Sequence, residues 1–458
     1  MATPINLPYA ITGIPAEPGK NGEVPLRLEC NDWTKSQEQV HIDQKNLFNL
    51  ALRFYVDMDP LDRDSFWQTA GIHGMPYMPW NESTLPQSVP VLGYCTHNSS
   101  LFPSWHRPYV VLFEQRIYEI MVNEIIPNQM PSDDKTQDSL KTAAKAWRLP
   151  YWDWAANNEV PLLAQDQEIE VFTKFGTAKI KNALYQYNLP QGKTFGTMGP
   201  ASNQTYTLVS ADGVPASTVD NGQVAKNIRN HEWYSTTEDD PTLRESVYRL
   251  LTYDVPYEVF ATTNMDPSDV EPLGYLNCEY IHNNVHNWVG GAAGQMGDVP
   301  VAAYDPIFFL HHCNIDRLYA IWQTLYPQKW FRATKVLKDN GTWSIPTDNP
   351  DTQCTQLAPF RPNNSGTYYT PDTVREWMQF GYSYPELQPW KYKTTEDYLL
   401  SINTDIAKLY RATADHISDS YEIGTDKDIV HYDHVINIRY GKALYIRSRP
   451  PHTQPLQT

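Results

Sequence analysis

Histidines are the residues of this chain whose spacing most strongly indicates chemistry. Seven of the 13 histidines fall in two windows, 73–106 and 282–312. His282 and His286 are four residues apart, so on a helix both rings would project from one face and could bind a single metal ion. His312 follows 26 residues later and can supply a third nitrogen. The second window therefore predicts a three-imidazole metal site.

The first window provides a second set of three imidazoles, from His73, His97 and His106. Three neutral imidazoles without a carboxylate suit copper, zinc or nickel, whereas a di-iron site would require Glu or Asp ligands that these windows do not place. A zinc protease is disfavoured, because His282-Asn-Asn-Val-His286 lacks the Glu that would act as general base. Copper and zinc remain, and two adjacent three-histidine sites point to a coupled binuclear copper centre.

Apolar periodicity near 3.6 residues predicts the helices that must carry these ligands, at 42–57, 108–126, about 272–288, 305–325 and 395–413. Asp305-Pro306 is a helix start, because Asp can cap free N–H groups and Pro fits the first helical position. Two polar stretches are expected to be long surface loops, at 195–230 and 337–372. Few strands are expected before the C-terminal tail, where 431–447 alternates like a β-hairpin.

Composition limits the class of protein. The chain has 458 residues, of which 41% are hydrophobic and 19% charged, so it is an ordinary globular sequence. Its formal charge of −17 argues against nucleic-acid and membrane-surface partners. Five scattered cysteines fit a reducing compartment, and neither a signal peptide nor a long apolar segment is seen, so an intracellular location is expected.

One motif in the second window resembles a known signature. Asp305-Pro306-x-Phe308 precedes His312, and Asp316 follows four residues later, as in the copper-B motif of tyrosinases. These enzymes belong with catechol oxidases and molluscan haemocyanins to the type-3 copper proteins, and the resemblance spans roughly residues 40–385. It implies two copper ions, held at copper A by His73, His97 and His106 and at copper B by His282, His286 and His312.

The resemblance also covers features outside the ligands. Cys95-Thr96-His97 matches the fungal form, in which the Cys sulfur is joined covalently to the His ring, and Tyr382-Ser383-Tyr384 matches the Tyr-x-Tyr pair that closes the core domain. We therefore expect a copper-binding core over 1–385, mainly α, with a four-helix bundle around the coppers and long loops. Residues 386–458 are expected to form a linker helix and a partial β unit, resembling the start of a C-terminal lid domain.

The activity that the resemblance implies is O2-dependent oxidation of small phenols, through a side-on peroxide bridging the two coppers, in a melanin-type or phenol-processing pathway. Tyrosinases active on monophenols often carry Glu and Asn where this chain has Glu279 and Asn283, sharing a water that accepts the phenol proton; otherwise Glu279 would be a salt-bridge partner. Val299 matches the gate position of plant catechol oxidases, and valine would leave the site open. Phe308 would face copper B or simply fill the core, and Asp316 would support a ligand or pair with a basic residue.

The leading hypothesis is a tyrosinase that hydroxylates monophenols and oxidises o-diphenols to o-quinones. A catechol oxidase would use the same six ligands for the second reaction alone. A haemocyanin-like O2 carrier and a zinc-binding structural protein are the alternatives from other classes. The expected partners are small phenols and O2, with no nucleic acid or membrane, and a homo-oligomer is compatible with the sequence.

Overall fold

The computed structural model of the chain describes residues 7–17, 19–81, 93–157, 159–190, 221–229, 242–264, 276–291, 294–332, 334–335, 342, 345 and 350–411. By its contacts the chain divides into the units 1–412 and 413–458. The second unit, with the predicted hairpin at 431–447, lies outside the described residues. The predicted domain boundary at 385 therefore stays a prediction.

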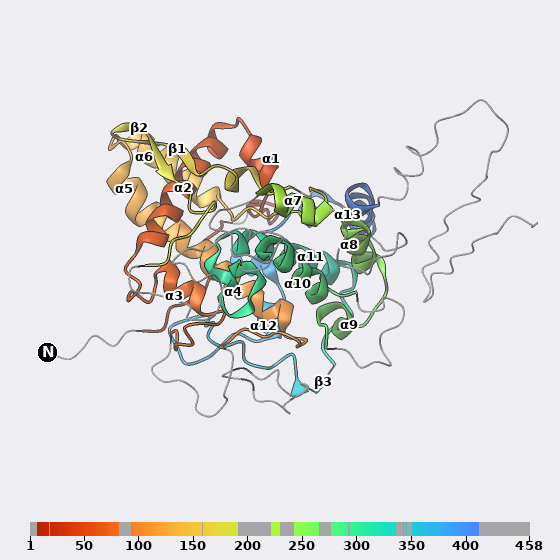
Figure 1. The fold of residues 1–458 in the computed structure, drawn as a ribbon. Helices are drawn as coiled ribbons and strands as arrows, with labels where there is room; N and C mark the ends of the chain where they lie inside the picture. Colours follow the sequence, from red (N-terminus) through yellow and green to blue (C-terminus); the bar gives the residue numbers. More distant parts are fainter. Residues whose placement is uncertain are drawn as a thin grey trace, which may run out of the picture. The chain divides into compact units, whose positions relative to one another are not determined.

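Four helices form the centre of the first unit: α2 (Gln39–Asp57), α4 (Phe102–Ile120), α10 (Cys278–Gly290) and α11 (Ile307–Leu325). α4 contacts α2, α10 and α11, and α10 also contacts α11, so segments far apart in the sequence lie side by side (Figure 1). This arrangement confirms the mainly helical fold with a helix bundle. Two of the helices, α10 and α11, contain the histidines of the second window.

Helix α11 is buried along nearly its whole length. Every residue from Ile307 to Gln323 is buried, the polar and charged ones included. The Oδ1 of Asp305 accepts a hydrogen bond of 3.2 Å from the N–H of Ile307, so the helix starts where Asp305-Pro306 predicts. The burial explains why polar residues on this helix require partners inside the protein.

The remaining elements surround this centre. The helices are α1 (Cys30–Lys35), α3 (Phe66–Gly71), η1 (Met121–Ile125), α5 (Ile126–Gln129), α6 (Asp134–Ala146), η2 (Leu162–Ala164), α7 (Asn221–Arg229), α8 (Leu243–Thr252), α9 (Tyr257–Ala261), η4 (Gln295–Gly297), η5 (Val299–Tyr304), α12 (Pro371–Val374), η6 (Trp377–Phe380), η7 (Pro389–Lys391) and α13 (Thr395–Tyr410). The strands form two antiparallel pairs: β1 (Glu168–Thr173) with β2 (Gly176–Lys181), and β3 (Thr334–Lys335) with β4 (Pro350–Asp351).

Two sequence expectations about helices were wrong. α4 begins at Phe102, six residues earlier than predicted, and Pro108 lies inside it. Complete burial of Phe102 and Trp105 in the core stabilises this first turn in spite of the proline. α7 lies within the segment 195–230 that was expected to be a loop. The two short strand pairs agree with the expectation of few strands before the tail.

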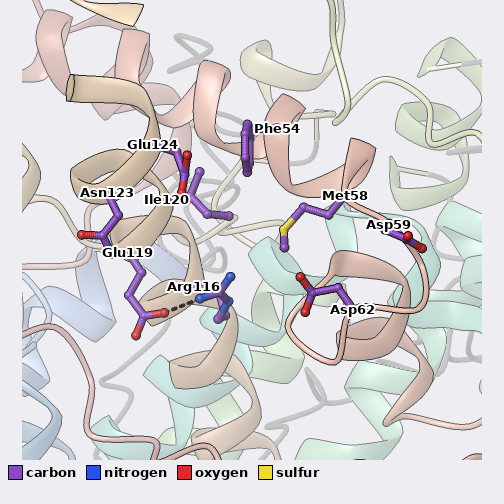
Figure 2. A pocket seen from close by; sticks show the side chains of 9 residues that line it. All are labelled: Phe54, Met58, Asp59, Asp62, Arg116, Glu119, Ile120, Asn123 and Glu124. Carbon is purple, nitrogen blue, oxygen red and sulfur yellow. Dashed lines mark hydrogen bonds and ion pairs between the residues drawn. The ribbon is translucent and has the colours of Figure 1, made fainter. Parts of the chain in front are cut away.

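A hollow of about 400 Å³ opens where α2, α4 and η1 meet (Figure 2). Arg116 forms an ion pair with Glu119 at its edge, and its walls include Asp62 and Glu124. The lining contains no histidine, so this hollow is separate from the histidine windows. Among the described residues, no helix combines the length and the apolar character needed to cross a bilayer.

Candidate metal centre

The structure brings the predicted ligands together in two groups. Within each group, one ligand atom per residue lies within 4.8 Å of the others. The groups are His73, Cys95, His97 and His106, and His282, His286, His311 and His312. All six predicted ligands are therefore present, and each group contains one further sulfur or nitrogen donor. The rings of His106 and His312 stack with centroids 4.5 Å apart, so the two groups adjoin.

Different elements supply the members of the two groups. His73 follows the end of α3, His97 lies in an irregular segment, and His106 is on the first part of α4. His282 and His286 lie one turn apart on α10, which begins with the Asn277 side chain accepting the N–H of Tyr280, and His312 lies on α11. The predicted i, i+4 pair is thus on a helix, as the spacing requires.

Backbone carbonyls orient three of the imidazoles. Each Nδ1 lies 2.7–2.8 Å from a carbonyl oxygen, in the pairs His73 with Val299, His106 with Phe102 and His286 with Met296. Since a carbonyl oxygen can only accept, Nδ1 carries the hydrogen and Nε2 keeps its lone pair. This orientation is typical of metal-binding histidines.

The nitrogens of the second group converge at metal-binding distances. Nε2 of His312 lies 3.1 Å from Nε2 of His282 and 3.1 Å from Nε2 of His286. Nitrogens bound about 2 Å from one tetrahedral ion would lie roughly 3.3 Å apart. Nε2 of His73 in the first group is buried without a hydrogen-bond partner in the described part of the chain. Both observations fit bound metal ions.

Burial keeps the ligand imidazoles neutral. It lowers the pKa of His97 to about 4 and that of His286 to about 3. The pKa values of His73, His106, His282 and His312 are also lowered by burial, and neighbouring imidazoles lower them further. Neutral imidazole is the form that binds copper or zinc, so the site is ready to accept either ion at neutral pH.

Cys95 lies between two imidazoles of the first group. Its Sγ is 3.8 Å from Nε2 of His97 and 3.3 Å from Nε2 of His106. Burial raises the pKa of the Cys95 thiol well above its usual value. The sulfur is thus placed beside the ring to which the predicted thioether would join it.

His311 has a partner of its own. Its Nδ1 accepts a hydrogen bond of 3.0 Å from Nε1 of Trp154, and its ring lies nearly parallel to that of His282 with centroids 5.1 Å apart. Trp154 therefore fixes the ring of His311, which packs against the predicted ligand His282. Sequence reasoning did not assign this role to Trp154, because only the tertiary structure brings residues 154 and 311 together.

Glu279 is fully buried and surrounded by donors. Its Oε1 accepts the N–H of Asn98 at 2.5 Å, and its Oε2 accepts the hydroxyl of Thr262 at 2.7 Å and the N–H of Thr263 at 2.9 Å. Burial raises the pKa of Glu279, and these hydrogen bonds counteract part of the rise. Glu279 therefore bonds to Asn98, Thr262 and Thr263, and it has no salt bridge with any residue that the structure describes.

Asn283 follows the ligand His282 on α10. Its Oδ1 lies 2.9 Å from Nδ1 of His282, which assigns the ring hydrogen to Nδ1 and leaves Nε2 facing the other nitrogens of the group. Asn283 is partly exposed, in contrast to the buried Glu279 one turn earlier. The two residues thus border the second group on the same helix.

Phe308 is buried, whereas Val299 is exposed to solvent. The Phe308 ring is buried, stacks on His312 with centroids 3.9 Å apart and meets His73 edge-on at 4.9 Å, so it packs against both groups. Val299 is 50% exposed, and its carbonyl oxygen bonds to His73. Val299 is consequently the only one of the two that can contact a molecule arriving from solvent.

Asp316 is part of a buried ionic cluster. Its carboxylate accepts hydrogen bonds from Arg107 at 2.6 Å, Arg27 at 3.1 Å and the hydroxyls of Tyr382 and Tyr384, both at 2.6 Å. The Tyr-x-Tyr pair and the aspartate of the copper-B motif therefore meet at one point. Asp316 joins α11 to α4 through Arg107, which adjoins a ligand in sequence, and has no hydrogen bond to a ligand imidazole among the described residues.

Comparisons with known proteins agree with this site. Residues 63–325 match the common central domain of tyrosinase. The chain is 32% identical to a tyrosinase of Neurospora crassa over 88% of this chain and 58% of that protein. It is 33% identical to a tyrosinase of Aspergillus fumigatus over 95% of this chain and 74% of that protein.

Solved structures show the same likeness. A copper-bound active tyrosinase variant of Aspergillus oryzae is 30% identical, with a TM-score of 0.71 over 88% of this chain and 99% of that one. The same variant in complex with L-tyrosine gives a TM-score of 0.72 at the same identity and coverage. The fold and the paired imidazole groups define a type-3 copper protein, and the chain belongs to the tyrosinase family. Its two histidine groups are suited to binding the two copper ions of that family.

Proposed function

We propose that this chain is a tyrosinase-type polyphenol oxidase that uses O2 to hydroxylate monophenols at the ortho position and to oxidise o-diphenols to o-quinones. The six predicted histidines hold two copper ions, which supply the electron-transfer chemistry with O2. The neutral, converging Nε2 atoms support this assignment. The Neurospora crassa relative is longer than the part that this chain matches, so the activity is proposed for the tyrosinase domain itself.

The placement of Glu279 and Asn283 on α10, each within one turn of His282, carries the assignment of monophenol hydroxylation. A phenol hydroxyl has a pKa of about 10, so a base must assist its ionisation near neutral pH. Oε1 of Glu279 accepts one hydrogen bond, from Asn98, and a carboxylate oxygen has room for a second. A water in that position would receive the phenol proton.

Asn283 would hold the same water from the other side. Its Oδ1 is occupied by the ring N–H of His282, so its amide hydrogens remain to donate to the water oxygen. Burial raises the pKa of Glu279, which makes its carboxylate a stronger base than an exposed one. Together the two side chains would orient the water and accept its proton.

Two other residues shape the approach of the phenol. The exposed side chain of Val299 is small, so it leaves room for an aromatic ring near the first group. The buried Phe308 ring stacks on His312 and contacts His73 edge-on, so it excludes water from the side of the imidazoles against which it packs. The substrate class is therefore a small phenol that enters past Val299.

Oxygen uptake with two substrate classes tests the proposal. Copper-loaded protein would be offered tyramine and, separately, catechol, with Glu279→Gln as the test variant and the exposed Glu396→Gln as control. Loss of the base should lower monophenol turnover by roughly 10²–10⁴-fold while diphenol oxidation persists. Uptake with catechol but not tyramine by the wild type would make the chain a catechol oxidase and remove the role of Glu279 as a base.

A further inference from the structure

His97 is oriented differently from the other ligands. Its segment is irregular, and among the described residues its ring has the sulfur of Cys95, 3.8 Å from Nε2, as its one hydrogen-bonding neighbour. Three other imidazoles are fixed through Nδ1 by a carbonyl oxygen, and His282 is fixed by Asn283. Other rings pack against His97, but the hydrogen bonds that fix this region lie in the main chain that follows it.

The next residue, Asn98, is anchored at two points. Its N–H donates to Glu279 at 2.5 Å, and its Oδ1 accepts the hydroxyl of Thr263 at 2.5 Å. Its φ of 49° lies in the left-handed region, which costs an L-residue roughly 1–2 kcal/mol and which asparagine tolerates better than most. The two anchors hold a main-chain conformation that the segment would otherwise leave.

A third anchor fixes the following residue. The hydroxyl of Ser99 donates to Oδ2 of Asp351 at 2.5 Å, and Asp351 is only 2% exposed. Asp351 is more than 250 residues away in the sequence, and Thr263 and Glu279 come from a third region. Residues 97–99 are thus tied to two distant segments, one of which begins the helix that carries the second ligand group.

We propose that Thr263 and Asp351 are positioning residues that hold the segment 97–99 so that His97 completes the first metal group. The inference rests on the proposed function in one respect, that His97 is a metal ligand. The predicted thioether would fix the ring of His97, whereas these contacts fix the main chain that carries it. Loss of an anchor should weaken copper binding by the first group. Binding by the second group should be unchanged, because its three predicted ligands lie on α10 and α11.

Equilibrium dialysis of the copper-free protein against buffered Cu²⁺, with bound metal counted by atomic absorption, tests the inference. Thr263→Val removes the hydroxyl at nearly constant shape, Thr263→Ser keeps it, and Ser99→Ala removes the third anchor independently. Thr252→Val is the matched control, because Thr252 is also partly buried but donates within its own helix, to the carbonyl of Tyr248. Thermal unfolding of each copper-free variant is recorded alongside.

The wild type and Thr252→Val should bind two Cu²⁺ per chain. Thr263→Val and Ser99→Ala should bind one Cu²⁺ with unchanged affinity and the second roughly 10–100-fold more weakly, as is common for residues that orient metal ligands. Thr263→Ser, which keeps the hydroxyl, should bind the second Cu²⁺ with the affinity of the wild type. Unchanged affinities in both variants would overturn the inference, as would equal weakening at both sites with a lower melting temperature. Two bound ions without oxidation of any phenol would instead contradict the proposed function and leave the positioning role intact.

Discussion

Replacing Asp316 with asparagine should destabilise the protein strongly. The carboxylate is 3% exposed and lies between Arg107 and Arg27. Arg27 keeps a second ionic partner in Glu114, whereas the hydrogen bonds that Arg107 keeps among the described residues go to two backbone carbonyls, of Val374 and Arg375. Removing one partner of a buried ion pair lowers the free energy of unfolding by about 3–5 kcal/mol. Because the two arginines keep other contacts, we expect a decrease near the lower limit, at about 3 kcal/mol.

The expected shift in melting temperature follows from the size of the first unit. An unfolding entropy of about 2.1 cal/mol/K per residue over some 400 residues converts about 3 kcal/mol into a decrease of roughly 3–4 °C. Calorimetry of the copper-free protein at pH 7 would measure it, with the exposed Asp138→Asn as control, for which a change under about 0.5 kcal/mol is expected. If Asp316→Asn lowered the free energy of unfolding by less than about 1 kcal/mol, the ionic cluster around Asp316 would not be a main link between α4 and α11.

The loss of stability in Asp316→Asn should depend on pH. Burial by itself would raise the pKa of Asp316, but Arg107, Arg27 and the two tyrosine hydroxyls hold it below its usual value. A lowered native pKa contributes stability that is present above the unfolded pKa of about 3.9 and is lost as the pH falls through the native value. The difference between wild type and Asp316→Asn should therefore be constant from pH 8 to about 5 and decrease below about pH 4.

Three further predictions concern the metal centre. The free energy of unfolding of the copper-free protein should decrease as the pH falls below about 6.5, because the unfolded chain binds protons that the buried imidazoles exclude; an equal melting temperature at pH 7.5 and 5.5 would contradict their lowered pKa values. Val299→Phe should raise KM for bulky phenols without changing bound copper, whereas the distant, exposed Leu400→Phe should change neither. If the thioether forms, mass spectrometry of copper-loaded protein should show the Cys95 peptide with two hydrogens fewer than its sequence requires, and Cys95→Ser should abolish this difference.

The sequence by itself determined the six candidate ligands and the helices of three of them, His282, His286 and His312. The i, i+4 spacing of His282 and His286 is a local property of a helix, and Asp305-Pro306 marks the start of α11, so both could be found without the fold. Resemblance to tyrosinases singled out His312 over its neighbour His311, and the Trp154 bond to His311 is consistent with that choice. The position of α4 was predicted less well, because its first turn is stabilised by tertiary burial.

Only the tertiary structure decided what surrounds the ligands. Glu279 contacts Asn98 across 181 positions of sequence, and Asp316 meets Arg27 across 289, separations over which no local pattern carries information. The partners of Asp316 are arginines and tyrosines instead of a ligand imidazole, a choice that the motif left open. Ligand identity follows from side-chain chemistry and short-range periodicity, whereas ligand orientation depends on contacts that exist only after the chain has folded.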